Sequence, residues 1–176
     1  MLIDDESNNK EDINIRELKK EKKVKNNKKV KKGESLEDQA NKLISLMRNY
    51  YENDIRMLRS NIRGELLRIK HVNDITSKMF NINLQEILLQ KNVLYEIKLW
   101  LEPLPDKSLP NIKIKKQLLE LLNGMNLITK NDLLKSDIGK IVNFYAQNMK
   151  ESYEVRSLAS SIIKKWKLVV IKEERS

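Results

Sequence analysis

Residues 98–122 read KLWLEPLPDKSLPNIKIKKQLLELL, and this stretch contains all three prolines of the chain, Pro103, Pro105 and Pro110. A proline inside a helix removes a backbone hydrogen bond, so these positions predict an ordered loop between helices. Apolar residues spaced three and four apart predict one helix before the loop and another after it. Asn111 is a suitable N-cap for the second helix.

The same helical spacing continues from the loop toward both ends of the chain. From the N-terminus onward, the expected helix starts are Ser35 with Asp38, Leu66 after a break at Gly64, Val93, Asn111, Thr129 with Asp132, Ser136, and Ser152. The helix after Asn111 has the predicted core face Ile114, Leu118, Leu121, Leu122 and Met125. Gly124 lies near the end of that helix, where we expect a left-handed residue.

These patterns predict an all-α fold, a single domain of about seven to eight short helices in a bundle or a short right-handed superhelix. The 176 residues include only 4 Gly and 3 Pro, whereas a strand-rich fold needs a turn about every 8–12 residues. We expect a disordered charged tail at residues 1–33, one helical interaction domain at 34–170 and a short C-terminal tail at 171–176.

The net charge of +10 is distributed unevenly along the chain. Residues 1–15 carry five acids and one Lys, residues 16–32 carry ten Lys or Arg and two Glu, and residues 33–176 carry 24 basic and 18 acidic residues. Blocks of like charge with few apolar anchors predict disorder before residue 33. The tail lysines that could contact nucleic-acid phosphates or signal nuclear import are Lys19, Lys20, Lys22, Lys23, Lys28, Lys29, Lys31 and Lys32. No aromatic residue lies among them to stack on bases.

Composition and motifs argue against catalysis, metal binding and membrane insertion. The chain has no Cys and a single histidine, His71, which leaves no thiolate chemistry and no histidine metal cluster. Phosphate-binding loops and nucleophile motifs are absent from the sequence, and no apolar run approaches the roughly 20 residues that span a bilayer. The acidic, polar start MLIDDESNNK does not resemble a secretory signal. We expect a soluble intracellular protein that is not an enzyme and uses no cofactor.

Four segments carry a family resemblance: KLWLEPLPDKSLPNI at 98–112, KIKKQLLELL at 113–122, LLKSDIGKIVNFYAQ at 133–147 and VRSLASSIIKKWK at 155–167. They resemble the Iws/Spn transcription elongation factors, which belong to the wider family of transcription factor S-II N-terminal, or LW, domains. The resemblance covers about residues 65–170 and implies an LW-like core at about 90–168, stacked like HEAT or ARM repeats. One departure is WKLVVI near the C-terminus, where the family pattern is similar to WxRPI.

The resemblance also implies a function. Proteins of this family are nuclear, non-enzymatic elongation factors that travel with RNA polymerase II. Their helical core receives a short peptide from the disordered N-terminal region of the Spt-type histone chaperone. The loop between the first two LW-core helices, together with the far end of the bundle, docks short linear motifs in family members. For this chain we expect a monomer in isolation.

We therefore expect a partner-binding groove beside the proline-containing loop. Its expected lining is Leu104, Asp106, Leu109, Lys113, Lys116, Lys140, Phe144 and Met149. Leu104 and Leu109 would supply apolar surface, and Asp106 would accept a hydrogen bond. The lysines would attract an acidic partner segment and raise its association rate. A rim that contains prolines loses little entropy on binding.

Structural interpretations of the same residues remain open. The loop can be a rigid connector, and the lysines can be ordinary solvated surface. Trp100 and Trp166 are expected in the core, and Gly139 is expected to permit close helix packing. For the whole chain, the alternatives are a basic nucleic-acid-binding protein acting through residues 16–32 and a purely structural subunit.

Overall fold

The computed structural model describes residues 33–175, and this part of the chain forms eight α-helices without any strand. The helices are α2 (Leu36–Arg59), α3 (Leu67–Met79), α4 (Ile82–Gln90), α5 (Val93–Leu101), α6 (Ile112–Gly124), α7 (Lys130–Ser136), α8 (Ile138–Gln147) and α9 (Tyr153–Glu174). The predicted all-α class is confirmed. None of these eight helices combines the length and the apolar character that a bilayer-spanning segment needs. The predicted lysine-rich segment, residues 19–32, lies outside the described residues.

Four of the predicted helix starts are confirmed by side-chain caps. Ser35 caps α2, Asn111 caps α6, Thr129 forms a capping box with Asp132 at α7, and Ser152 caps α9. Each cap accepts a hydrogen bond from a backbone N–H that the first helical turn leaves unpaired, which contributes about 1 kcal/mol.

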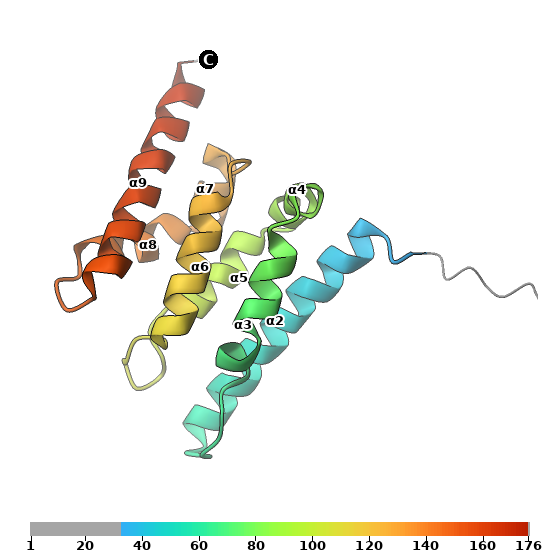
Figure 1. Ribbon diagram of the computed structural model, residues 1–176, viewed down its shortest axis with the longest axis vertical. Coiled ribbons are helices and arrows are strands. Elements are labelled where there is room, and N and C mark those ends of the chain that lie inside the picture. The colour runs from blue at the N-terminus through green and yellow to red at the C-terminus, as the bar shows by residue number, and fades with distance from the viewer. Residues whose placement is uncertain (1–32, 176) are drawn as a thin grey trace, which may run out of the picture. The chain divides into compact units, whose positions relative to one another are not determined.

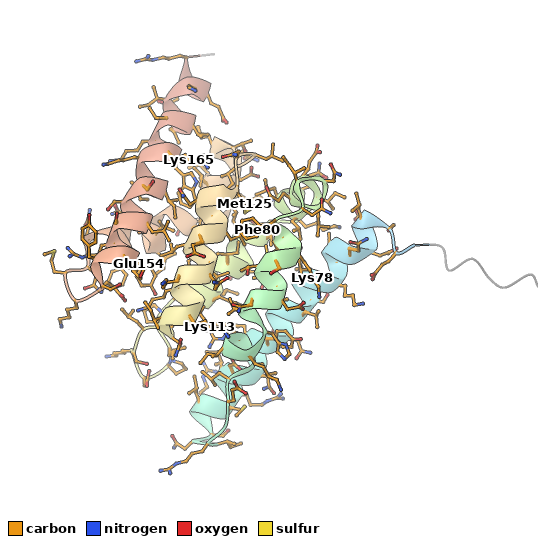
Figure 2. The ribbon with its side chains drawn as sticks, viewed as in Figure 1. Lys78, Phe80, Lys113, Met125, Glu154 and Lys165 are labelled. Atoms are coloured by element: carbon orange, nitrogen blue, oxygen red, sulfur yellow. The ribbon has the colours of Figure 1, made fainter. Side chains whose placement is uncertain are left out.

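Three local predictions differ from the structure. Helix α4 is an additional element, which begins after the N-cap Asn81. Ser136 ends α7 and does not start a helix, because Asp137, with φ of 58°, separates α7 from α8. The backbone of Gly124 does not adopt the left-handed conformation that the sequence predicted. A β-carbon at Gly124 would lie 3.1 Å from the ring of Phe80, so this glycine leaves room for the aromatic ring (Figure 2).

The helices form two layers. Helices α2, α3, α6 and α9 lie side by side in one layer, and each packs against the next (Figure 1). Helices α4, α5, α7 and α8 lie behind them, where α5 contacts α4, α7 and α8 as well as α2 and α6. The proline-containing loop joins α5 to α6 and therefore connects the two layers.

The hydrophobic core contains both tryptophans, as predicted. Trp100 is fully buried, and its Nε1–H donates to the carbonyl oxygen of Met47 at 3.0 Å, which links α5 to α2. Trp166 on α9 is 4% exposed. The predicted core face of α6 is buried throughout, at Ile114, Leu118, Leu121, Leu122 and Met125. Because burial of one large apolar side chain contributes about 1.5–3 kcal/mol, these residues account for much of the stability.

A buried ion pair joins α2 to the start of α3. The side chains of Asp54 and Arg68 are both 0% exposed, and Oδ2 of Asp54 accepts from Nε of Arg68 at 2.9 Å. The same carboxylate accepts the backbone N–H groups of Leu67 at 2.7 Å and of Arg68 at 3.1 Å. Since Leu66, the residue at the N-cap, makes no side-chain cap bond, Asp54 caps α3 from a neighbouring helix.

Helix α9 extends further than predicted. It continues to Glu174, so the tail predicted from residue 171 is wrong over residues 171–174. Lys165 fastens α9 to the end of α6, because its Nζ donates to the carbonyl oxygens of Asn123 at 2.7 Å and Met125 at 3.3 Å (Figure 2). A cation at this position also complements the carbonyl groups that a helix C-terminus leaves unpaired.

Candidate peptide-docking site

The loop between α5 and α6 is held in shape by hydrogen bonds of its own. The backbone N–H of Leu104 donates to the carbonyl oxygen of Ser108 at 2.8 Å, and that of Lys107 donates to the carbonyl oxygen of Leu104 at 2.8 Å. Oδ1 of Asp106 accepts from the hydroxyl of Ser108 at 2.6 Å and from its N–H at 3.0 Å. These bonds, the hydroxyl first, lower the pKa of Asp106. Asp106 therefore shapes the loop through Oδ1, and its predicted role as an acceptor for a partner stays a prediction.

The two ends of the loop are fastened to the core. Leu109 packs against the hydrophobic cluster, and Pro110 is buried. The hydroxyl of Tyr145 on α8 donates to the carbonyl oxygen of Leu101 at 2.6 Å, directly before the loop. Burial raises the pKa of Tyr145, so this hydroxyl keeps its proton. The loop is consequently rigid, which fits both the predicted groove rim and a rigid connector.

A hollow of about 370 Å³ lies beside the loop, and we call it the bend pocket. Its lining is Lys98, Glu102, Pro103, Asp137, Lys140, Ile141 and Phe144. The ring of Phe144 is 43% exposed and meets the ring of Tyr145 edge to face, with centroids 5.4 Å apart. Lys140 forms an ion pair with Asp137 at 3.0 Å on the rim. The pocket thus offers a fixed aromatic surface bordered by charge, which suits an apolar side chain flanked by polar groups.

Two of the eight residues predicted for the groove line the bend pocket, namely Lys140 and Phe144. Three others, Leu104, Asp106 and Leu109, belong to the adjacent loop, which also provides the pocket residue Pro103. Pro103 of the loop and Lys140 and Phe144 of α8 therefore lie together at the bend pocket, and a docking role for them stays a prediction.

The remaining three predicted residues do not line the bend pocket. Nζ of Lys116 lies 2.7 Å from Oε1 of Glu154 on α9 (Figure 2). The hydrogen bond to this carboxylate raises the pKa of Lys116. Lys113 is exposed in the first turn of α6. Met149 is 78% exposed after α8, with its sulfur 3.2 Å from Nη1 of Arg156. A docking role for these three residues stays a prediction.

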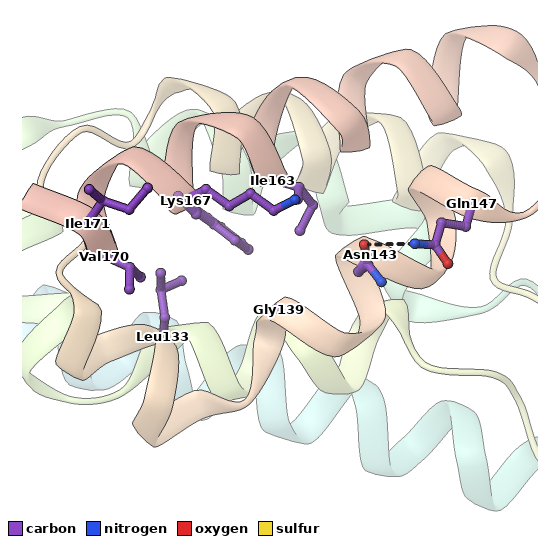
Figure 3. A pocket seen from close by; sticks show the side chains of 9 residues that line it. Leu133, Gly139, Asn143, Gln147, Ile163, Lys167, Val170 and Ile171 are labelled. Carbon is purple, nitrogen blue, oxygen red and sulfur yellow. Dashed lines mark hydrogen bonds between the residues drawn. The ribbon is translucent and has the colours of Figure 1, made fainter.

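A second hollow, of about 650 Å³, lies between α8 and the C-terminal half of α9, and we call it the α8–α9 groove (Figure 3). Its lining is Leu133, Gly139, Asn143, Gln147, Ile163, Trp166, Lys167, Val170 and Ile171. None of these residues belongs to the groove that the sequence predicts. One signal in the sequence could have indicated this groove. The five lining residues on α9 recur at three- and four-residue steps, and this helical spacing extends through the segment WKLVVI.

Gly139, in the wall of the α8–α9 groove, does not have its predicted packing role. A β-carbon at this position would meet no atom within 4 Å. Close helix packing therefore does not require glycine here. The missing side chain instead leaves the groove wider at this point.

Comparison with known proteins identifies relatives of the described domain. Residues 117–170 match the Med26 family model, described as a TFIIS helical bundle-like domain. The chain is 33% identical over 104 residues to transcription factor SPN1 of Saccharomyces cerevisiae, covering 59% of this chain and 25% of that protein. It is 37% identical over 112 residues to protein IWS1 homolog 2 of Arabidopsis thaliana, covering 61% and 27% respectively. The chain thus spans about a quarter of the length of these relatives.

A solved structure matches over a larger share of the chain. The crystal structure of an Spt6–Iws1(Spn1) complex from Encephalitozoon cuniculi contains a chain that is 41% identical, with a TM-score of 0.75. The match covers 78% of the present chain and 98% of the matched one. Identity of this level over a whole solved domain, with the same helical architecture, shows that the chain belongs to the Iws1/Spn1 family of transcription factors.

Proposed function

We propose that the chain is a non-enzymatic adaptor of transcription elongation in the nucleus. Its bend pocket and the adjoining loop receive a short segment of an Spt6-type histone chaperone, and the domain links that chaperone to elongating RNA polymerase II. The observation that carries the proposal is the hollow beside the fixed proline-containing loop, in a domain 41% identical to a chain of an Spt6–Iws1 complex.

The geometry of the bend pocket supports peptide recognition. Phe144 presents a half-exposed aromatic surface, and aromatic side chains often dominate the energy of such interfaces. The loop is already ordered by hydrogen bonds within it, so binding does not have to order it. Lys140, whose side chain is 80% exposed, would attract an acidic segment and mainly raise its association rate.

The pairing of buried charges supports a role without catalysis. Asp54 is paired with Arg68, Glu96 with Arg48 and Lys115 with Glu151, so each of these charges has a structural partner. A group of at least three metal-binding side chains is not found among the described residues.

Titration of a fluorescent N-terminal segment of the cognate Spt6 protein onto the full chain tests the proposal. Phe144→Ala is expected to weaken binding about tenfold or more, as for a central aromatic contact. Tyr153→Ala is the matched control, because Tyr153 is also an exposed aromatic residue but lines neither hollow. Lys140→Asp should slow association more than it speeds dissociation. Equal affinity of the Phe144→Ala and Tyr153→Ala variants would contradict the proposed site.

A further inference from the structure

The α8–α9 groove is separate from the bend pocket, although both use α8. Gly139, Asn143 and Gln147 recur every four residues on one face of the helix and line the groove. Lys140 and Phe144 lie on the neighbouring face and line the bend pocket. The two hollows share no lining residue, so a ligand can occupy the groove without touching the pocket.

The groove has mainly apolar walls. Ile163 and Val170 from α9 and Leu133 from α7 point toward the same space (Figure 3). Its volume, about 650 Å³, falls within the range of about 300–1,000 Å³ that is common for ligand sites. It can therefore take at least one large apolar side chain.

A buried donor in the groove lining lacks an acceptor. Nε1 of Trp166 has no hydrogen-bond partner and is covered by its neighbours, whereas Nε1 of Trp100 donates to the carbonyl oxygen of Met47. An unpaired buried N–H costs about 1–3 kcal/mol. Because Trp166 lines the groove, a ligand that displaces a covering side chain and brings an oxygen atom would relieve this cost.

The charge of the lining favours an acidic ligand. Lys167 is the charged member of the lining, and no acidic residue accompanies it there. The side chain of Lys167 forms no ion pair and no hydrogen bond with the described residues. The domain from residue 33 onward is itself basic, with 24 Lys or Arg against 18 Asp or Glu. A carboxylate beside the apolar side chain of the ligand would meet Lys167 at the rim.

From these observations we infer that the α8–α9 groove is a second docking site, which binds a short peptide segment presenting an apolar side chain next to an aspartate or glutamate. The apolar side chain fills the space beside Gly139, the carboxylate pairs with Lys167, and an oxygen of the peptide accepts from Nε1 of Trp166. This site goes beyond the proposed Spt6-type contact, because it uses different residues.

Random peptides of about 12 residues, displayed on phage, are the probe for this site. Selection uses the full chain with Phe144→Asp, so that binding at the bend pocket does not contribute. The expected sequences combine Asp or Glu with Leu, Ile or Phe. Failure to recover binding peptides, or recovery of peptides without acidic residues, would overturn the inference.

Three variants and one spectroscopic signal then locate the binding site of the recovered peptides. Gly139→Leu places a side chain in the groove at a position where a β-carbon meets no atom within 4 Å, and it should weaken binding about tenfold. Lys167→Glu should weaken it several-fold, whereas Lys164→Glu should not, since Lys164 is an exposed lysine of the same helix outside the groove. In nitrogen-15 NMR spectra, the indole signal of Trp166 should shift on binding while that of Trp100 stays in place. Unchanged affinity for Gly139→Leu, or a stationary Trp166 signal, would refute the site.

This test and that of the proposed function give distinguishable results. Loss of Spt6-segment binding in Phe144→Ala concerns the bend pocket only. Peptides selected on the Phe144→Asp chain report on the α8–α9 groove even if the Spt6 segment does not bind at all.

Discussion

Replacement of Asp54 by alanine removes the acceptor of three hydrogen bonds inside the domain. The carboxylate accepts the backbone N–H groups of Leu67 and Arg68 and Nε of Arg68, at 2.7, 3.1 and 2.9 Å. Both charged side chains are 0% exposed, so the change leaves a guanidinium away from water without its counter-charge. Breaking one half of a buried pair costs about 3–5 kcal/mol, and loss of a helix cap costs about 1 kcal/mol more.

The reciprocal variant, Arg68→Met, should be milder. Asp54 would keep its two backbone donors, whereas Arg68 already lacks partners at Nη1 and Nη2. We expect a loss of about 2–3 kcal/mol for Arg68→Met, in the range for an incompletely satisfied buried charge. The double variant Asp54→Ala/Arg68→Met should recover part of the loss of Asp54→Ala, because it buries no charge.

Urea denaturation of the full chain, followed by tryptophan fluorescence and far-ultraviolet circular dichroism, measures these losses. A domain of this size has a total stability of about 5–15 kcal/mol, so the Asp54→Ala variant should be strongly destabilised. Asp74→Ala is the control, because its ion pair with Lys78 is exposed at both ends and contributes at most about 1 kcal/mol. If Asp54→Ala proves no more harmful than Asp74→Ala, or milder than Arg68→Met, the reasoning is refuted.

Other variants test the remaining structural assignments. Glu151→Ala should cost about 3 kcal/mol in the same denaturation assay, because its lysine partner on α6 is only 10% exposed; a loss like that of a surface pair would contradict this. Gly124→Ala should change stability by less than about 1 kcal/mol, since its backbone is not left-handed and the exposed ring of Phe80 can move aside; a larger loss would show that the ring is fixed. Ser108→Ala should raise the pKa of Asp106 toward its usual value in a carboxyl NMR titration, because the serine hydroxyl is the main cause of the lowered pKa. In the unchanged chain, the stabilising bonds to Asp106 should persist at neutral pH and be lost as the pH falls through that lowered value.

Local signals in the sequence were sufficient for most helix starts. A cap such as Ser35 or Thr129 acts within its own first turn, so the residues that decide it are three positions apart. Helix α4 was missed because its nine residues, INLQEILLQ, follow α3 after only two residues and show no separate break. The end of α9 was missed because WKLVVI is rich in β-branched residues, whereas packing of Trp166 in the core favours helix there.

The candidate site was predictable only where neighbouring residues define it. The loop and the start of α8 were found from their motifs, and Lys140 and Phe144 line the resulting pocket. The ion pair of Lys116 with Glu154 joins residues far apart in the chain, so the spacing of the sequence could not predict it. The bonds from Ser108 to Asp106 were not predicted, because they depend on the folded shape of the loop; the predicted role of Asp106 in partner binding stays a prediction.

The way α8 is held determines whether ligands at its two faces can influence each other. Coupling between two sites requires two arrangements of the shared element that the ligands stabilise differently. Tyr145 on α8 is fully buried, and its hydroxyl donates to the carbonyl oxygen of Leu101. Movement of α8 would break this bond and leave buried polar groups unpaired, at a cost of about 1–3 kcal/mol for each group. A single arrangement is therefore favoured, and the bend pocket and the α8–α9 groove should bind their segments independently. A domain that can hold two different segments at the same time can join two partners, as an adaptor must.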